Sequence, residues 1–228
     1  MEVITTHVNA DFDSIGAMIA TKKLYPDAVL VFPGSKELSL REFFLHSVTY
    51  IFSSEKIKNI DLEKITRLIL VDTCQSSRIG DFKQIIKKKG VDIHIYDHHP
   101  QNIDDIRGSL NVVERVGAAT TILCECLKEK NIDITPDEAT IMMVGIYEDT
   151  GNFAYISTTT RDYLAAAYLL EKGANLNIVS DLITKQLTKD QVYLLKELIN
   201  SATKYNIKGI EIAVATAKTN KYIGDFAV

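Results

Sequence analysis

The chain has 228 residues, of which 46% are hydrophobic and 25% charged, the composition of an ordinary globular protein. Its 26 basic and 30 acidic residues give a net charge of −4, which excludes nucleic-acid or membrane binding driven by bulk charge. No apolar run approaches the roughly 20 residues of a membrane span, and the acidic N-terminus is unlike a signal peptide. Cys74, Cys124 and Cys126 include no CxxC pair, so we interpret them as buried or half-buried thiols in a reducing cytoplasm.

The first half of the chain alternates predicted strands with predicted helices. The strands are short and apolar, and they are expected at 3–6, 28–32, 68–71 and 93–96. A helix with Ser14 as its N-cap follows the first strand, and another is expected at about 38–52. The lysines of segment 82–90 are typical of the last turn of a helix that Gly90 closes. Continuous apolar strands separated by helices predict an α/β fold with a parallel sheet flanked by helices.

The second half is predicted to be mainly helical. Helices are expected at 117–130, 136–148, 160–173 and 188–205. A strand returns only at 210–215, and it has no partner left in the sequence. We therefore expect a main domain at 1–185, a linker helix at 186–206 and, at 207–228, the start of a truncated second domain.

Ionisable residues follow three of the predicted strands. The first strand leads into His7–Ser14, the third ends at Asp72 and the fourth at Asp97-His98-His99. Ligands of open α/β sheets bind outside the carboxyl ends of the strands, so these segments are predicted to converge on one crevice. A fourth segment, 148–153, follows a helix and turns at its glycine.

The spacing of the first segment requires a turn. His7 and Asp11 would lie about 13 Å apart in an extended chain, too far to share a metal ion. The segment must therefore curl after the strand, which Asn9-Ala10 permits.

The predicted crevice gathers carboxylates whose charges repel one another: Asp11, Asp13, Asp72 and Asp149. A pair of divalent ions resolves that repulsion and can clamp the attacking and leaving oxygens of a displacement at phosphorus. Mixed imidazole and carboxylate ligands suit Mn²⁺, Fe²⁺ or Co²⁺ better than Mg²⁺. The plainer interpretation is that acids after strands cap helices and that Asp-His-His is a surface loop. His46 and His94 have no acidic residues at a spacing that suits a shared metal ion, and they are interpreted as structural.

Four ordered motifs resemble those of the DHH phosphoesterase superfamily. They are Thr6–Gly16, Val71-Asp72, Asp97-His98-His99 and Gly145–Phe153. The resemblance spans about residues 3–205 and implies a Rossmann-like sheet. Within the superfamily the chain looks most like the N-terminal DHH module of bacterial fusion proteins that also carry CBS domains and a tRNA nucleotidyltransferase/poly(A) polymerase domain.

The resemblance implies two divalent ions, most simply Mn²⁺, with Mg²⁺ or Co²⁺ as alternatives. Their ligands would be His7, Asp11 and Asp72 for one ion and Asp13, Asp72, His98 and Asp149 for the other. His99 would face the substrate phosphate as a hydrogen-bond donor or proton source, and Asp97 would orient a histidine. The 117–121 segment resembles a helix start whose N–H groups could receive a phosphate; the alternative is a small-residue helix packed tightly on the sheet.

The chain departs from the family pattern at its C-terminal end. The glycine-rich motif with which a DHHA1 domain grips substrate is absent, although 210–215 resembles the beginning of that domain. We therefore expect the chain to bind metals but to hydrolyse substrate poorly, because positioning supplies much of the rate.

The function implied is a cytoplasmic two-metal phosphoesterase acting on small phosphorylated nucleotides or very short oligonucleotides. Pyrophosphate or polyphosphate is an alternative substrate. A second alternative is a regulatory or RNA-handling module of a tRNA nucleotidyltransferase/poly(A) polymerase. RNA would then be a partner through the missing C-terminal domains; a homodimer is left open and a membrane is not expected.

Overall fold

The computed structural model describes residues 1–34, 53–183 and 189–218. The helix predicted at 38–52 and His46 lie outside these residues. The chain divides into two compact units, Met1–Ile183 and Thr184–Val228.

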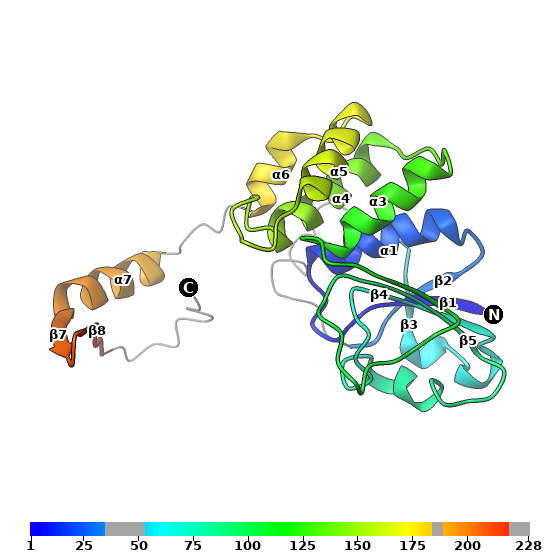
Figure 1. The fold of residues 1–228 in the computed structure, drawn as a ribbon, viewed down its shortest axis with the longest axis horizontal. Coiled ribbons are helices and arrows are strands. Elements are labelled where there is room, and N and C mark those ends of the chain that lie inside the picture. Colours follow the sequence, from blue (N-terminus) through cyan, green and yellow to red (C-terminus); the bar gives the residue numbers. More distant parts are fainter. Residues whose placement is uncertain (35–52, 184–188, 219–228) are drawn as a thin grey trace. The chain divides into compact units, whose positions relative to one another are not determined.

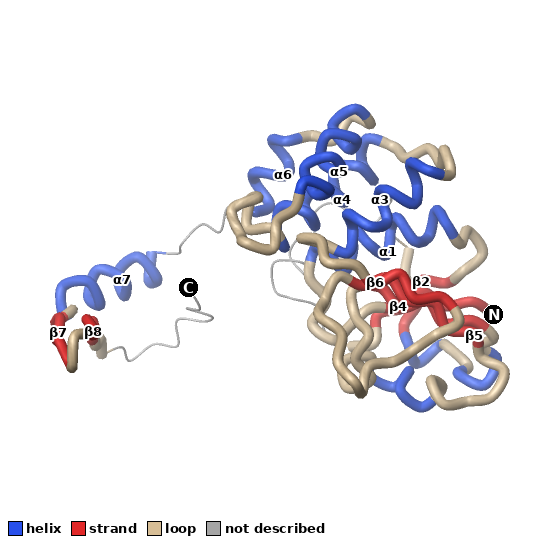
Figure 2. The backbone as a smooth tube through the Cα atoms, viewed as in Figure 1, coloured by secondary structure: helices blue, strands red, loops and turns tan. Residues whose placement is uncertain are grey.

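A parallel sheet of six strands forms the centre of the first unit (Figure 2). The strands are β1 (Glu2–Thr5), β2 (Val29–Phe32), β3 (Glu55–Lys56), β4 (Arg67–Val71), β5 (Asp92–Asp97) and β6 (Leu110–Val113). Their order in the sheet is β3-β2-β1-β4-β5-β6, and every neighbouring pair is parallel. The predicted α/β fold is confirmed. Strand β6 was not predicted, because it is a half-buried edge strand with a polar residue, Asn111, in its middle.

Both faces of the sheet are buried, which is why its strands read as continuous apolar runs. Alternate residues point to opposite faces: Ile4 and Ile69 pack against the long helices. Val3 and Leu68 pack on the other side, in a second core that includes Phe82. The sheet therefore separates two hydrophobic cores.

Five helices in the described part of the first unit lie on one side of the sheet (Figure 1). They are α1 (Phe12–Leu24), α3 (Ala119–Glu129), α4 (Pro136–Asp149), α5 (Thr160–Glu171) and α6 (Leu176–Ile183). Helices α1 and α3 pack against the strands, and the others pack on these two helices or on one another. Helix α4 begins with a capping box in which Thr135 and Glu138 satisfy each other's backbone N–H groups. Helix α6 was not predicted.

Short 3₁₀ helices cover the opposite face: η1 (Ile57–Asn59), η2 (Leu62–Lys64) and η3 (Gly80–Gln84). The helical ending predicted for segment 82–90 is wrong, because the chain continues from η3 as a series of turns. Lys88 does not complement a helix end there; its ammonium group donates to the backbone oxygen and the carboxylate of Glu63.

Helix α1 begins three residues earlier than predicted. Its N-cap is Asp11, whose Oδ1 accepts a hydrogen bond from the backbone N–H of Ser14 at 2.9 Å. Ser14, predicted as the N-cap, lies in the first turn, and its hydroxyl is fully buried. Both residue types cap helices well, so the local sequence does not decide between them.

Two glycines let α1 and α4 approach closely. A Cβ atom on Gly145 of α4 would lie 2.9 Å from the Cα of Asp13 and from the backbone oxygen of Phe12. A Cβ on Gly16 of α1 would lie 3.2 Å from the Cα of Met142 in α4, and 2.6 Å from the Thr120 hydroxyl of α3. Because Asp149 ends α4 and Asp13 begins α1, this close packing also sets the separation of two carboxylates.

The second unit contains α7 (Lys189–Ser201), β7 (Thr203–Ile207) and β8 (Ile210–Val214). The two strands pair antiparallel, with Thr203 opposite Val214. Lys208 (φ 53°) and Gly209 (φ 85°) form the connecting turn, whose positive φ angles suit a two-residue hairpin. The prediction of an unpartnered strand was therefore wrong: its partner begins at Thr203, within the segment predicted as a linker helix.

Two expectations from composition agree with the structure. Among the described residues, no helix is both long enough and apolar enough to cross a lipid bilayer. The three cysteines are free thiols; Cys74 and Cys124 are buried and Cys126 is half-buried.

Asp162 is a buried carboxylate that joins the starts of two helices. It accepts hydrogen bonds from the Gly117 N–H, from the Thr121 hydroxyl and from both the N–H and the hydroxyl of Thr159. Its side chain is fully buried, as are the Gly117 N–H and the Thr121 hydroxyl, which would lose their partner without gaining water.

We expect Asp162→Ala to lower the free energy of unfolding by about 3 kcal/mol, because it leaves the buried donors of Gly117 and Thr121 unsatisfied. Urea denaturation measures the effect. Asp137→Ala, at an exposed position in the first turn of α4, is the control and should cost less than about 1 kcal/mol. Equal losses in the two variants would contradict the role assigned to Asp162.

We expect Gly145→Ala to destabilise the chain by about 1–3 kcal/mol, because the added methyl group meets the backbone of α1. The same variant should bind divalent metal more weakly, since α1 and α4 would separate. Urea denaturation and metal titration measure the two effects. Alanine is intrinsically the better helix former, so a gain in stability would show that the two helices have room to spare.

Candidate metal centre

The candidate site lies where the strand order reverses. The chain builds β2 and β3 on one side of β1, and it then places β4, β5 and β6 on the other. His7 follows β1 and Asp72 follows β4, so both stand at the carboxyl ends of the two strands that flank this reversal. This is where open α/β sheets bind their ligands.

The first group of candidate ligands is His7, Asp11 and Asp72. The Nε2 atom of His7 lies 3.1 Å from Oδ2 of Asp72 and 3.4 Å from Oδ2 of Asp11. The turn that the spacing requires is present: Asn9 has a φ angle of 59°, a conformation that asparagine tolerates. The turn brings the carboxylate at position 11 back onto the histidine.

A buried hydroxyl, which the sequence analysis took only as a helix cap, organises this group. The Oγ of Ser14 donates to Oδ2 of Asp72 at 2.7 Å and lies 2.9 Å from Nε2 of His7. Thr6 donates to the same Oγ at 2.9 Å. The two hydroxyls thus fix the imidazole and the carboxylate relative to each other.

The second group is Asp13, Asp72, His98 and Asp149. The Nε2 atom of His98 lies 3.1 Å from Oδ2 of Asp149, 3.5 Å from Oδ1 of Asp72 and 3.9 Å from Oδ2 of Asp13. Asp72 belongs to both groups, with one oxygen toward each histidine. Its φ angle of 59° ends β4 abruptly. All six ligands predicted from the sequence are therefore brought together.

Asp13 is held by the first turn of a helix distant in sequence. Its two oxygens accept hydrogen bonds from the backbone N–H groups of Ala119, at 2.7 Å, and Thr120, at 2.9 Å. The Gly117 N–H is bonded to Asp162. These donors are therefore occupied by carboxylates, and the interpretation of segment 117–121 as a phosphate receptor is wrong.

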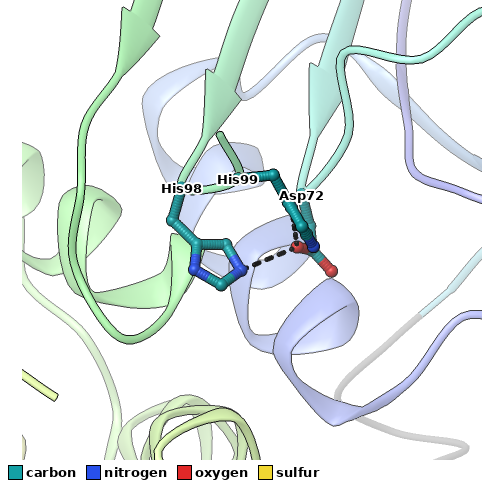
Figure 3. A group of neighbouring side chains, drawn as sticks. All are labelled: Asp72, His98 and His99. Carbon is teal, nitrogen blue, oxygen red and sulfur yellow. Dashed lines mark ion pairs between the residues drawn. The ribbon is translucent and has the colours of Figure 1, made fainter. Parts of the chain in front are cut away.

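His99 lies beside Asp72 and His98 of the second group (Figure 3), and Asp97 is bonded to His99. Asp97 Oδ1 accepts hydrogen bonds from His99 Nδ1 at 2.7 Å and from the N–H groups of His98 and His99. Nδ1 of His99 is 3.7 Å from Oδ1 of Asp72. Asp97 is fully buried, whereas the His99 side chain is 36% exposed and accessible to a ligand.

Glu148 is a further residue at the site to which the sequence analysis gave no role. Its Oε2 accepts a hydrogen bond from the backbone N–H of Phe12 at 2.8 Å. Phe12 lies between Asp11 and Asp13, so this bond ties the end of α4 to the segment that carries two candidate ligands. The position beside Asp149 was the only signal for it in the sequence.

The carboxylates hold protons on the neighbouring imidazoles. Burial opposes the charged form of His7, but hydrogen bonds and charge from Asp11 and Asp72 raise its pKa to about 10. Burial likewise opposes the charge on His98, and Asp149 and Asp72 nevertheless raise its pKa to about 12. The centre thus attracts positive charge strongly.

The pKa values of the carboxylates reflect the same excess of negative charge. Burial and the charges of Asp72 and Asp149 raise the pKa of Asp13 well above its usual range. Burial and neighbouring acids also raise the pKa of Asp149, against the effect of His98. The pKa of Asp72 is lowered despite its burial, because the neighbouring imidazoles of His7 and His98 stabilise its negative charge. Divalent cations would remove this conflict between neighbouring acids.

The donor set fits metal ions. Within each group, one candidate ligand atom per residue lies within 4.8 Å of all the others. Oδ1 of Asp72 and Nε2 of His98 are both buried and have no hydrogen-bond partner among the described residues, although they face each other (Figure 3). Buried polar atoms rarely remain in that condition, and a shared cation would satisfy both. His94 stands apart, bonded to Tyr25 and Asp92.

Solved structures share this fold. An exopolyphosphatase-related protein from Bacteroides fragilis superposes with a TM-score of 0.71 at 16% identity, covering 89% of this chain and 62% of that protein. A putative family II inorganic pyrophosphatase from Methanococcus jannaschii superposes with a TM-score of 0.64 at 22% identity, covering 94% of this chain and 71% of that protein. At these identities the likeness concerns the fold alone.

Sequence relatives are closer. A-adding tRNA nucleotidyltransferases from Geobacter sulfurreducens and Aquifex aeolicus are 52% and 40% identical over 100% and 98% of this chain. The chain spans about a quarter of their length, 26% in each case. A probable bifunctional oligoribonuclease and PAP phosphatase NrnA from Streptococcus mutans is 24% identical over 86% of this chain and 61% of its own.

A protein-family model also matches this chain. The description "DHH family, N-terminal domain" matches residues 2–146, which contain every candidate ligand except Asp149. The predicted resemblance, including the likeness to bacterial tRNA nucleotidyltransferases, is confirmed. The chain belongs to the DHH family.

Proposed function

We propose that the first unit is a metal-dependent phosphoesterase domain that acts on small phosphorylated nucleotides or very short oligonucleotides. One observation carries the proposal: the Asp72 carboxylate directs one oxygen to the His7 group and the other to the His98 group. A carboxylate shared in this way is the ligand that a pair of metal ions needs. The position of Asp72 at the reversal of strand order, where open α/β sheets bind ligands, also supports the proposal.

Six residues would hold two divalent ions: His7, Asp11 and Asp72 on one side, and Asp13, Asp72, His98 and Asp149 on the other. The mixture of imidazole and carboxylate favours Mn²⁺, with Co²⁺ or Mg²⁺ as alternatives. When bound, such ions neutralise phosphate oxygens and lower the pKa of water.

The residues around the ligands have separate tasks in this proposal. Asp97 fixes the ring of His99 through Nδ1, which leaves Nε2 as the nitrogen that can donate to a phosphate. The hydrogen bond from Asp97 raises the pKa of His99, so the ring is favoured as a proton donor. Ser14 and Glu148 keep the first ligands in position.

Relatives support a nucleotide substrate. The protein from Streptococcus mutans is described as an oligoribonuclease and PAP phosphatase, and a Thermus thermophilus protein described in the same terms is 31% identical over 78% of this chain. Inorganic pyrophosphate and polyphosphate are the competing substrates. A panel of adenosine 3′,5′-bisphosphate, a dinucleotide and pyrophosphate separates them.

A second candidate function is a regulatory or RNA-handling module of a tRNA nucleotidyltransferase. The high identity to two A-adding tRNA nucleotidyltransferases favours it. The candidates differ at His99, because a module that only binds metal or RNA has no use for a proton donor beside the phosphate.

We expect the purified chain to bind about two Mn²⁺ ions and Asp72→Asn to lose most of this metal, since the substitution removes charge from both groups. Metal analysis after dialysis measures the content, and hydrolysis of the substrate panel should fall by more than about 100-fold. Asp104→Asn, on an exposed loop, is the matched control. Unchanged metal content in Asp72→Asn would refute the binuclear site.

We expect His99→Gln to keep its Mn²⁺ but to slow hydrolysis by about 100-fold or more, because a positioned proton donor is lost. His94→Gln, remote from the cluster, should retain normal turnover. The test measures the turnover rate and the Mn²⁺ content of both variants. Full hydrolysis by His99→Gln would contradict the proton-donor role of His99, whereas a wild-type chain that binds Mn²⁺ without hydrolysing any substrate of the panel would favour the RNA-handling module.

A further inference from the structure

Three aromatic rings form a cluster near the end of α4, the helix that carries Asp149. Phe153 lies nearly parallel to Tyr163, with ring centroids 4.7 Å apart and an interplanar angle of 23°. Tyr147 meets the Phe153 ring edge-on, at 4.8 Å and 78°. We call Tyr147, Phe153 and Tyr163 the aromatic ledge.

The ledge is tied to the ligand Asp149. Tyr147 precedes this residue in α4, and Phe153 follows it by four positions, a separation that even an extended chain limits to about 14 Å. The chain does not extend here: the Asn152 N–H bonds to the Tyr147 carbonyl at 2.8 Å, folding the loop back on α4. The ledge therefore lies at the end of α4 that carries Asp149.

The loop adopts an uncommon backbone to place the Phe153 ring. Gly151, Asn152 and Phe153 all have positive φ angles, of 55°, 57° and 63°. Glycine and asparagine tolerate this region, but a bulky residue such as phenylalanine enters it at a cost. Thr150 holds the strained residue through a bond from the Phe153 N–H to its hydroxyl at 3.1 Å. Such strain is typical of sites where a side chain has a task beyond packing.

The outer part of the ledge is open to solvent. Tyr163 is 56% exposed although one face of its ring is stacked on Phe153. Its hydroxyl donates to the Phe153 carbonyl at 3.4 Å, which restrains the ring. The neighbouring loop residues Tyr155 and Ile156 are also exposed. A restrained aromatic ring with one face free is a surface on which another flat ring can stack.

We propose that the aromatic ledge is a nucleobase-binding subsite, in which a base stacks on the exposed face of Tyr163 while its phosphate lies at the metal centre. The inference rests on the proposed phosphoesterase function and narrows its substrate to base-containing phosphates. Stacking uses the π-face that every base has, so the subsite selects nucleotides over pyrophosphate without strong preference among bases.

Binding of AMP and ribose 5-phosphate to the Mn²⁺-loaded chain tests the inference, because the two ligands differ only in the base. Calorimetry should show AMP binding about tenfold or more tighter than ribose 5-phosphate. Tyr163→Ala should abolish this difference and leave ribose 5-phosphate binding and Mn²⁺ content unchanged. Tyr163→Phe should retain the difference, and Leu164→Ala, an equally exposed truncation on α5, should also retain it.

A measurement on the wild-type chain makes the test independent of variant stability. Stacking on Tyr163 should move the adenine H2 and H8 resonances of AMP upfield in NMR spectra, with Mg²⁺ replacing the paramagnetic Mn²⁺. Equal affinities for AMP and ribose 5-phosphate, with no upfield shift, would overturn the nucleobase subsite and leave the metal centre intact. Failure of both ligands to bind the metal-loaded chain would overturn the phosphoesterase function and the subsite with it.

Discussion

The constraint on which the first unit depends is the burial of negative charge at one end of its sheet. Four carboxylates meet two imidazoles there, and Asp13 and Asp72 are almost wholly removed from water. Burying such groups is costly unless each is bonded or neutralised. The surrounding fold supplies part of the compensation: the start of α3 solvates Asp13, and the Ser14 hydroxyl bonds to Asp72. Cations complete it in the proposed function.

The same constraint explains how the helical layer is built. Asp13 accepts its hydrogen bonds from α3, Glu148 of α4 bonds to the start of α1, and Gly145 lets these two helices touch. Asp162 secures the start of α3 to α5. The packing of the helices therefore also sets the positions of the candidate ligands. A substitution that loosens the helices should displace these ligands even when it changes none of them.

The sequence predicted the sheet because it follows from local patterns, whereas the candidate ligand set was implied by the resemblance to the DHH superfamily. Apolar strands mark the sheet, and polar residues directly after them, such as Asp72, must lie at its carboxyl edge. It could not assign the bonds from Ala119 and Thr120 to Asp13, since these join segments about a hundred residues apart. Strand β6 was not predicted because it is half-buried and has a polar residue in its middle, and β7 was not predicted because its exposed residues were assigned to the end of the preceding helix. The choice of Ser14 over Asp11 as N-cap failed because both types suit that position.

The spread of the ligands along the chain has a consequence for biosynthesis. The first group needs residues only as far as Asp72, but the second needs Asp149, at the end of α4. A nascent chain can therefore gather the His7 group early and cannot complete the centre until α4 has left the ribosome. The Thr184–Val228 unit contributes no described ligand, so its emergence is not required. Under the proposed function, the first group could therefore bind its ion before the second group is complete.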